Sequence, residues 1–180
     1  MTSSAESAGS DAVSVIIPAH NAEATLADCL DAVMAQQAPG LTLEVLVVDD
    51  RSTDGTRSVA CRPGVRLLDG SGRGPAAARN LGARSASGSI LVFLDADTRP
   101  KPGWLNELLT PLVDPEVAAV KGAYDSDQRG LLARFAQLEF EYKYARLERA
   151  QRVDFVDTGT AAFRRDAFER IGGFDERFPA

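Results

Sequence analysis

The sequence predicts an α/β domain built on a mostly parallel sheet with helices on both faces, and two features support this. Short apolar runs alternate with segments of helical spacing through the first two-thirds of the chain, as in strands joined by crossover helices. The apolar runs are continuous, for example Ile-Leu-Val-Phe-Leu at 90–94, which indicates strands buried on both faces. A chain of 180 residues is long enough for one such domain with a substantial core.

The composition restricts the classes of function. A formal net charge of −6 argues against a general nucleic-acid surface, because such surfaces need clustered Lys and Arg. No apolar segment approaches the ~20 residues of a membrane span. Cys29 and Cys61 form no Cys-x-x-Cys pair, so we expect free thiols in a reducing, cytoplasmic compartment. Residues 1–11 lack the features of a signal peptide and are predicted to be a disordered tail before a domain at 12–180.

The strands are predicted from apolar runs and the helices from apolar residues three and four positions apart. In chain order, we expect a strand at 13–18, a helix at 22–37, strands at 43–48 and 65–68, a helix at 75–86, a strand at 90–94, a helix at 102–113, a strand at 117–122, a helix at 130–150, short apolar runs at 153–156 and 160–163, and a helix at 165–171.

Prolines and glycines mark the ends of several elements. Pro18 is expected to end the first strand, because proline has no amide to donate to a ladder. Pro39 with Gly40 stops the first long helix, and Gly172 with Gly173 stops the last one. The roles of two sets of aromatic residues have alternatives. Trp104 is expected in the core rather than as a ligand platform, and the aromatic residues of 130–150 suit either a solvated helix or a partner helix.

The glycine-rich segment 70–74 follows the third predicted strand. A dinucleotide-binding G-x-G-x-x-G would need glycine where Pro75 stands, and it would follow the first strand. A nicotinamide or flavin site is therefore disfavoured, and the loop is expected to turn the chain into the helix at 75–86. Arg79 lies one turn into that helix, where it either projects toward the strand ends or is a solvated surface residue.

Polar residues follow three of the predicted strands. They are Pro18-Ala-His-Asn21 after the first, Asp49-Asp50 after the second, and Asp95-Ala-Asp97 after the strand at 90–94. The carboxyl ends of parallel strands meet at one edge of a sheet, where ligands bind. Two carboxylates this close repel each other unless a cation is present, and Mg²⁺ takes oxygen ligands while leaving positions for phosphates. The sequence therefore favours a metal site for a phosphorylated substrate over the alternative, a capped turn.

Five blocks of the sequence, taken together, resemble the inverting, nucleotide-sugar-dependent glycosyltransferases of family 2. They are VSVIIPAHN at 13–21, EVLVVDDRSTDGT at 44–56, GPAAARNLG at 74–82, FLDAD at 93–97 and GGFDE at 172–176. The blocks occur in the family's order and span nearly the whole chain beyond the tail. The resemblance implies a GT-A fold, which is a Rossmann-like mostly parallel sheet with helices on both faces.

The resemblance also implies a role for each matching position. The residues that would contact the nucleotide are Pro18, His20, Asp49, Arg79 and Asp95, with Asp95 on the ribose side and Arg79 at a phosphate or uracil. Asp97 would hold the Mg²⁺ or Mn²⁺ that bridges the two phosphates, and Thr158 with Gly159 would lie near the donor sugar and acceptor. His20 has the alternative of an ordinary turn residue. A UDP-sugar is favoured over guanosine and thymidine donors, and the acceptor is unknown.

The family carries an acidic pair shortly after the GGFDE block, and this pair supplies the general base. The sequence stops at Ala180, before that pair is expected, and Asp175 and Glu176 belong to the preceding block. The catalytic base is therefore expected beyond Ala180. These 180 residues are expected to bind nucleotide-sugar and metal but to transfer sugar poorly or not at all.

Two other readings remain at this stage. A sugar-1-phosphate nucleotidyltransferase would need a glycine-rich loop directly after the first strand, where this chain has Pro18-Ala-His-Asn21. A non-catalytic binding or interaction module would keep the fold without turnover. Further expectations are a homodimer formed through 130–150 and peripheral association with the inner face of a membrane.

Overall fold

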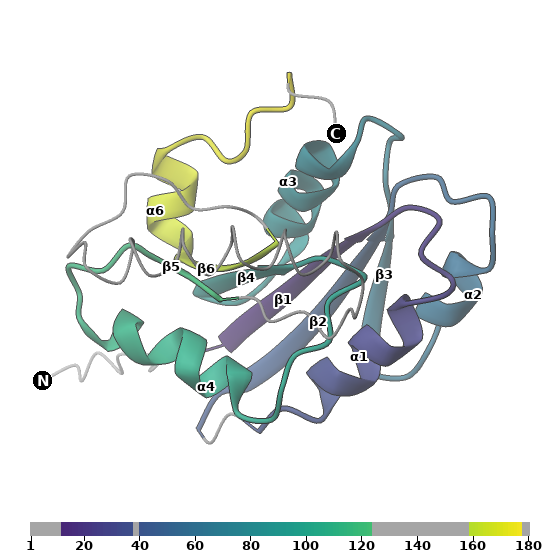
Figure 1. Ribbon diagram of the computed structural model, residues 1–180. Coiled ribbons are helices and arrows are strands. Elements are labelled where there is room, and N and C mark those ends of the chain that lie inside the picture. Colours follow the sequence, from purple (N-terminus) through teal and green to yellow (C-terminus); the bar gives the residue numbers. More distant parts are fainter. Residues whose placement is uncertain (1–11, 38–39, 124–158, 178–180) are drawn as a thin grey trace, which may run out of the picture.

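The computed structural model describes residues 12–37, 40–123 and 159–177. It contains a six-stranded sheet with the strand order β3-β2-β1-β4-β6-β5, covered by helices on both faces (Figure 1). β3, β2, β1 and β4 run parallel, and β6 is antiparallel to both β4 and β5. The predicted fold class, a mostly parallel α/β sheet, is confirmed. Within these ranges no helix combines the length and apolar character that crossing a membrane requires.

The strands are β1 (Ala12–Ala19), β2 (Thr42–Asp49), β3 (Val65–Asp69), β4 (Ile90–Leu94), β5 (Ala119–Lys121) and β6 (Thr160–Arg164). The helices are α1 (Leu26–Met34), α2 (Thr56–Ala60), α3 (Pro75–Ser85), α4 (Trp104–Leu109), the 3-10 helix η1 (Thr110–Val113) and α6 (Arg165–Arg170). The predicted helix at 130–150, the apolar run at 153–156 and Thr158 lie outside the described residues.

The prediction that Pro18 ends the first strand was wrong. β1 continues to Ala19, and Pro18 is paired with Val48 in the register of β1 and β2. The β1–β4 ladder stops earlier, at Ile16↔Phe93. Because the Ala19 carbonyl faces β2, where it accepts from the amide of Asp50 at 2.8 Å, the nitrogen of Pro18 faces the side on which pairing has already ended. The missing amide therefore costs no ladder bond.

Two predicted helices are shorter than expected. Residues 22–25 form a turn before α1, and the predicted helix at 102–113 is divided into α4 and η1. Pro111 lies in the first turn of η1, where its missing amide is tolerated. Arg164 at the end of β6 binds carbonyls in and after this segment, donating from Nη2 to Leu112 O at 2.5 Å and from Nε to Val117 O at 3.0 Å.

Alternation along the strands divides the core between the two faces. Val15, Val47 and Val92 face α1, α2 and α4, whereas Ile16 and Phe93 face α3 and α6. Trp104 packs against the first of these clusters, as predicted. The strand predicted at 117–122 is reduced to β5, a half-buried edge strand, because only β6 pairs with it.

Helix α3 lies unusually close to the sheet. A Cβ added at Gly82 would lie 2.3 Å from Ile16 Cγ2, so only glycine allows this approach. Because α3 begins at the glycine-rich loop, its distance from the sheet also sets how far the side chains of its first turns reach toward the strand ends. This places Arg79 next to the end of β4.

Candidate functional site

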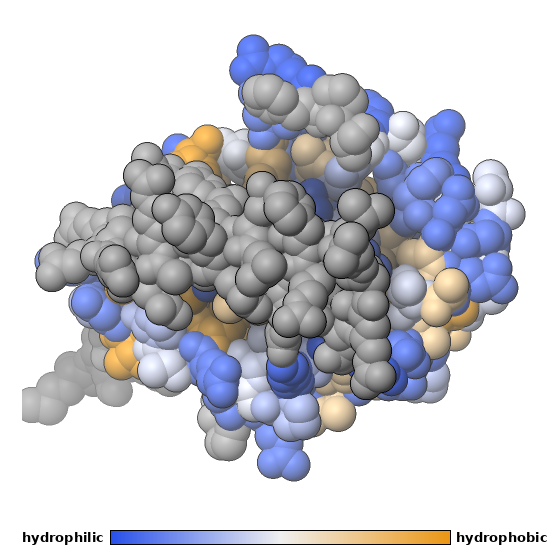
Figure 2. Space-filling view, viewed as in Figure 1, coloured by the Kyte–Doolittle hydropathy of each residue, from blue (hydrophilic) through white to orange (hydrophobic). Residues whose placement is uncertain are grey.

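The carboxyl ends of the parallel strands lie side by side. Ala19 is in register with Asp49, and Asp49 with Asp69, so the loops that follow β1, β2 and β3 leave one edge of the sheet together. The loop after β4 leaves the same edge, because β4 is parallel to β1. Figure 2 shows mainly hydrophilic residues along the right-hand edge of the view, where Figure 1 places the loops around α2 and before α3. The predicted convergence of polar strand ends is therefore present.

Asp95 is held in place by contacts from three directions. Arg79 donates from Nη2 to Asp95 Oδ1 at 2.6 Å. The backbone amide of Asp95 donates to Gly159 O at 3.0 Å, and its carbonyl accepts from Thr98 N at 3.0 Å. The last bond is a backbone bond that closes a turn over residues 95–98. It is not the side-chain cap that was the alternative to a metal site, since the N-cap residue of α4 is Gly103, with no side-chain cap bond in the described structure.

Arg79 is a buried residue, with 8% of its surface exposed. The interpretation as a solvated surface arginine was wrong, because the side chain runs from α3 to the end of β4. Its Nε is buried and has no hydrogen-bond partner among the residues that the structure describes. A buried guanidinium that is paired on one side and unpaired on another carries a desolvation cost, which a bound acceptor group would offset.

Asp97 differs from Asp95 in its surroundings. Its side chain is exposed, and no group in the described part of the chain hydrogen-bonds or ion-pairs with its carboxylate. Those residues contain no cluster of three or more His, Cys, Asp or Glu side chains that would enclose a metal. A free carboxylate beside an occupied one fits Mg²⁺ or Mn²⁺ held by few protein ligands, with water and donor phosphates in the other positions.

Cys29 lies beneath this pair and was not predicted to be near the site. Its Sγ is 3.7 Å from the carbonyl oxygen of Asp95, to which it donates. Burial, together with the charges of Asp97 and Asp95, raises the pKa of the Cys29 thiol to about 12. The thiol is therefore neutral at physiological pH and is no nucleophile.

Asp49 is buried at the end of β2 and points toward α2. Its Oδ1 accepts from the amide of Ser52 at 3.1 Å, and its Oδ2 lies 3.7 Å from Arg57 Nη1. Arg57 also hydrogen-bonds to Asp69 at the end of β3. Asp49 is therefore an acceptor fixed between two strand ends, in the position predicted for a nucleotide contact.

Asp50 joins three of the loops, although only its neighbour was singled out as a site residue. Its two carboxylate oxygens accept the amides of Gly72 at 2.6 Å and Gly74 at 2.8 Å. Its backbone carbonyl lies 2.9 Å from Nδ1 of His20. The sequence held one indication of this role, since a glycine-rich loop with bare amides needs an acceptor nearby.

His20 is exposed and oriented by two neighbours. A carbonyl can only accept, so Nδ1 of His20 carries the proton that bonds to Asp50 O. The other nitrogen, Nε2, is then the acceptor for Asn21 Nδ2 at 3.2 Å. The turn-residue interpretation of His20 is thus compatible with its place at the edge of the site. Pro18, which lies in β1 two residues before His20, is half-buried.

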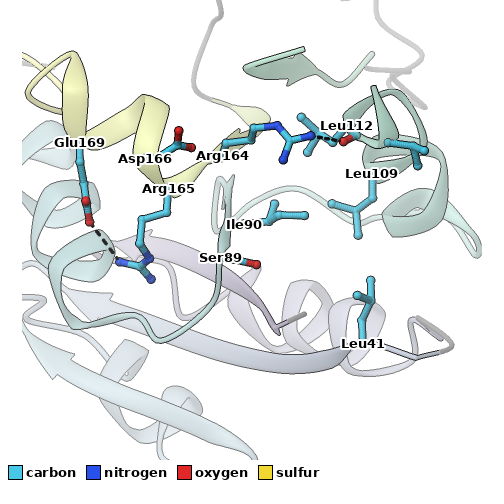
Figure 3. Close-up of a pocket in the computed structure, with 10 residues that line it drawn as sticks. Leu41, Ser89, Ile90, Leu109, Leu112, Arg164, Arg165, Asp166 and Glu169 are labelled. Atoms are coloured by element: carbon cyan, nitrogen blue, oxygen red, sulfur yellow. Dashed lines mark hydrogen bonds and ion pairs between the residues drawn. The ribbon is translucent and has the colours of Figure 1, made fainter. Parts of the chain in front are cut away.

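A cavity of about 560 Å³ lies away from these loops (Figure 3). It is bordered by Ile90, which begins β4, and by Leu109 and Leu112. The guanidinium of Arg165 in its wall already donates to the carbonyls of Gly88, Ala83 and Ala86. Because Ile90 is the first residue of β4, the cavity lies at the amino end of this strand, opposite the candidate site at the carboxyl ends.

The fold and the site define a class, that of α/β domains which bind a ligand across the carboxyl ends of parallel strands beside a free carboxylate. Residues 14–172 match the family described as glycosyl transferase family 2, and the chain belongs to this family. The predicted membership in family 2 is thereby confirmed.

Two proteins with similar sequences are themselves described as glycosyltransferases. The chain is 39% identical over 116 residues to the glycosyltransferase AglE of Haloferax volcanii, and the aligned region covers 61% of this chain and 38% of that protein. It is 31% identical over 174 residues to a pre-mycofactocin glycosyltransferase of Mycobacterium tuberculosis, covering 91% of this chain and 36% of that protein. The chain thus spans less than half the length of these relatives.

Solved structures show the same fold. A mannosyltransferase from Pyrobaculum calidifontis, in complex with GDP-Man and Mn²⁺, superposes with a TM-score of 0.75 at 32% identity over 91% of this chain and 47% of that chain. Glucosyl-3-phosphoglycerate synthase from Mycobacterium tuberculosis, in complex with Mn²⁺, UDP-glucose and phosphoglyceric acid, has a TM-score of 0.62 at 26% identity over 87% and 57%. The sheet of this chain is therefore a GT-A glycosyltransferase sheet.

Proposed function

We propose that this domain binds a nucleoside diphosphate sugar together with Mg²⁺ or Mn²⁺ and transfers the sugar, with inversion, to an acceptor hydroxyl. The observation that carries the proposal is the carboxylate of Asp97, which no described residue shares and which lies two residues from the Arg79–Asp95 pair at the convergent strand ends. The Mn²⁺ complexes of the two related enzymes support the cation. A bound cation would offset the negative charge that develops on the departing diphosphate.

The proposed roles of the residues follow from their surroundings. Asp97 would hold the cation, and Asp95 would face the ribose with its orientation fixed by Arg79. The Nε of Arg79, which has no partner in the described part of the chain, supports a contact to an acceptor atom of the nucleotide. Asp49 and His20 would contact the nucleobase and ribose beside the end of β1. Gly159, whose carbonyl accepts from Asp95 N, would lie near the donor sugar with Thr158.

The donor is proposed to be a UDP-sugar, with a GDP-sugar as the second candidate. Relatives of known structure were solved with both kinds of donor, UDP-glucose and GDP-Man. The acceptor, the site of action in the cell and any homodimer stay predictions. Membership in family 2 leaves no support for the nucleotidyltransferase alternative, and the non-catalytic module remains the competing proposal.

Inversion requires a base that removes the acceptor proton while the sugar carbon is attacked from the face opposite the diphosphate. Arg177 lowers the pKa of Asp175 to about 2 through hydrogen bonds to its carboxylate, far below the range useful to a base. Both carboxylate oxygens of Glu176 have partners, Asn80 and Arg73. We therefore assign the base to neither residue, and we propose that it lies outside the described residues.

Calorimetric titration with UDP and with GDP, each with and without Mn²⁺, tests the proposal. We expect Mn²⁺-dependent binding by the wild-type chain that is lost in Asp97→Ala. Asp114→Ala is the matched control, because this acidic residue follows η1 on another part of the chain. Nucleotide binding that does not respond to Mn²⁺ would refute the metal site, and no binding of either nucleotide would refute the donor site and leave the interaction module.

A further inference from the structure

The GGFDE block is fixed onto α3 by one buried side chain. Asn80 is 6% exposed. It donates from Nδ2 to Phe174 O at 2.9 Å and to Glu176 Oε1 at 2.9 Å, and its Oδ1 accepts from Phe174 N at 2.9 Å. A Cβ at Gly173 would lie 2.7 Å from Asn80 Oδ1, so this backbone can approach the amide only because the residue is glycine. All of these contacts join residues more than ninety positions apart.

Glu176 connects this block to the glycine-rich loop as well. Its Oε1 accepts from Asn80, and its Oε2 lies 3.1 Å from Nη2 of Arg73. Arg73 stands between Gly72 and Gly74, whose amides bind the carboxylate of Asp50. The glycine-rich loop is therefore bound at two places, by Glu176 at the side chain of Arg73 and by Asp50 at the amides of Gly72 and Gly74.

Phe174 connects the block to the metal side of the site. Its ring packs edge-on against Phe93 of β4 with centroids 4.8 Å apart. The guanidinium carbon of Arg79 lies 6.0 Å from the centre of the same ring, within the range of a cation–π contact. Since Arg79 bonds to Asp95, a displacement of Phe174 would change the packing of the arginine that orients this carboxylate.

We propose that Asn80 and Glu176 are positioning residues for the donor site: together with Arg73 and Phe174 they form a rim latch that fixes the glycine-rich loop and Arg79 in their binding geometry. The inference rests on the proposed function and assigns no proton transfer to Glu176. The two carboxylate oxygens are used in holding the latch, and neither contacts Asp95 or Asp97.

Burial decides which bonds of the rim latch matter most. The pair formed by Arg73 and Glu176 has side-chain exposures of 64% and 28%, and partly exposed ion pairs contribute little. The Asn80 bonds are made by a side chain that is almost fully enclosed, and losing them would leave partly buried backbone groups of Phe174 without these partners. Asn80 is therefore the centre of the latch, and Glu176 extends it to the loop.

The test measures the affinity of Mn²⁺ and UDP by calorimetry, with GDP in place of UDP if the wild type prefers it. Asn80→Ala and Glu176→Ala are each expected to weaken nucleotide binding about tenfold, as loss of groups that orient ligand-binding side chains does. Glu176→Gln keeps an acceptor for Asn80 but not the charge facing Arg73, and it is expected to retain most of the affinity. Asp175→Asn, in the same segment, is the control and should bind like the wild type.

Stability must be separated from positioning. Leu112→Ala removes a core side chain at the opposite edge of the sheet, and its Tm loss provides a reference for Asn80→Ala. We expect this control to bind nucleotide normally despite its lower Tm. Equal weakening in Leu112→Ala and Asn80→Ala would overturn the inference, since the effect would then be general destabilisation. If Asn80→Ala does not fold, the Glu176 variants give the answer on their own.

Two further results would contradict the rim latch. Nucleotide affinity in Glu176→Ala equal to that of Asp175→Asn would show that the latch has no influence on the donor site. Sugar transfer by the wild-type chain that Glu176→Gln abolishes without a change in affinity would make Glu176 the base, against the expectation that these residues transfer sugar poorly. Both results leave donor binding by the wild type intact. Failure of the wild type to bind any nucleotide is a different outcome, which removes the proposed function itself and the inference with it.

Discussion

Arg79 donates a hydrogen bond of 2.6 Å to Asp95, from the middle of α3 to the end of β4. The arginine is buried and the aspartate is half-buried, so the bond orients a carboxylate that would otherwise be free to rotate. Asp97, two residues later, is exposed and has no such partner among the residues described. The chemically identical residues of the DAD motif are thus made different by what surrounds them. One is held for orientation, and the other is free for a cation.

Asp97→Asn is expected to abolish Mn²⁺-dependent nucleotide binding while leaving the fold intact. The amide keeps the size of the side chain but lacks the negative charge that a hard divalent cation prefers. Because the side chain is exposed and makes no hydrogen bond in the described structure, its replacement should change the free energy of unfolding by less than about 0.5 kcal/mol. Titration of Mn²⁺ in the presence of UDP measures the first effect, and urea unfolding the second.

Arg79→Met is expected to lower both stability and nucleotide affinity. Methionine keeps much of the apolar stem but removes the donor to Asp95, and a hydrogen bond to a charged group contributes about 2 kcal/mol. Urea unfolding of Arg79→Met and of Asp95→Asn measures this loss, and the double variant should lose less than the sum of the two, because the residues share one bond. Strict additivity would show that the two side chains act independently.

Asp50→Asn is expected to loosen the glycine-rich loop. The asparagine has one acceptor oxygen for two amides, so one of the bonds to Gly72 and Gly74 is replaced by a contact between two donors. We expect a loss of about 1–3 kcal/mol in the free energy of unfolding. Asp31→Asn is the matched control, because Asp31 is 70% exposed in its pair with Arg62 and such pairs contribute about 0–1 kcal/mol. Equal losses in the two variants would contradict the role given to Asp50.

The thiol of Cys29 predicts a specific pH dependence. Burial, with the charges of Asp97 and Asp95, raises its pKa from 9.0 to about 12. A pKa that is higher in the folded chain than in the unfolded one stabilises the fold fully below pH 9.0, and this contribution is lost as the pH rises toward about 12. The free energy of unfolding should therefore fall over this range more steeply in the wild type than in Cys29→Ala.

The two cysteines should also differ in reactivity. Cys61 is exposed and Cys29 is buried, so iodoacetamide at pH 8 should label Cys61 alone in the folded chain and both thiols in urea. Cys61→Ser isolates the Cys29 thiol for this measurement. Rapid labelling of Cys29 in folded Cys61→Ser would contradict the burial that raises its pKa.

Much of the fold could be predicted because local and periodic signals agree. The continuous apolar runs of β1, β2 and β4 required a sheet covered on both faces, and Gly172 with Gly173 marked the end of α6. The errors occurred where an answer depended on a neighbouring strand. Pro18 stays within β1 because the ladder on its nitrogen side has already ended, and no sequence window contains that information.

The candidate site, like the fold, was predicted only in part from the sequence. The acidic strand ends, the placement of Asp95 and Asp97 after β4 and the membership in family 2 could all be read from the order of residues. The roles of Arg79, Asp50, Asn80 and Cys29 could not, because each is set by a contact across a large sequence separation, such as the 94 positions between Asn80 and Phe174.

The sequence by itself determined which residues are available at the carboxyl edge, since strand direction and loop chemistry are local properties. Only the tertiary structure decided which carboxylates are already engaged. Asp50 binds the glycine loop, Asp95 binds Arg79, and Glu176 binds Asn80, which leaves Asp97 unshared among the described residues of this edge. The physical reason is that hydrogen bonding and burial depend on what packs against a side chain, and those neighbours come from distant parts of the chain.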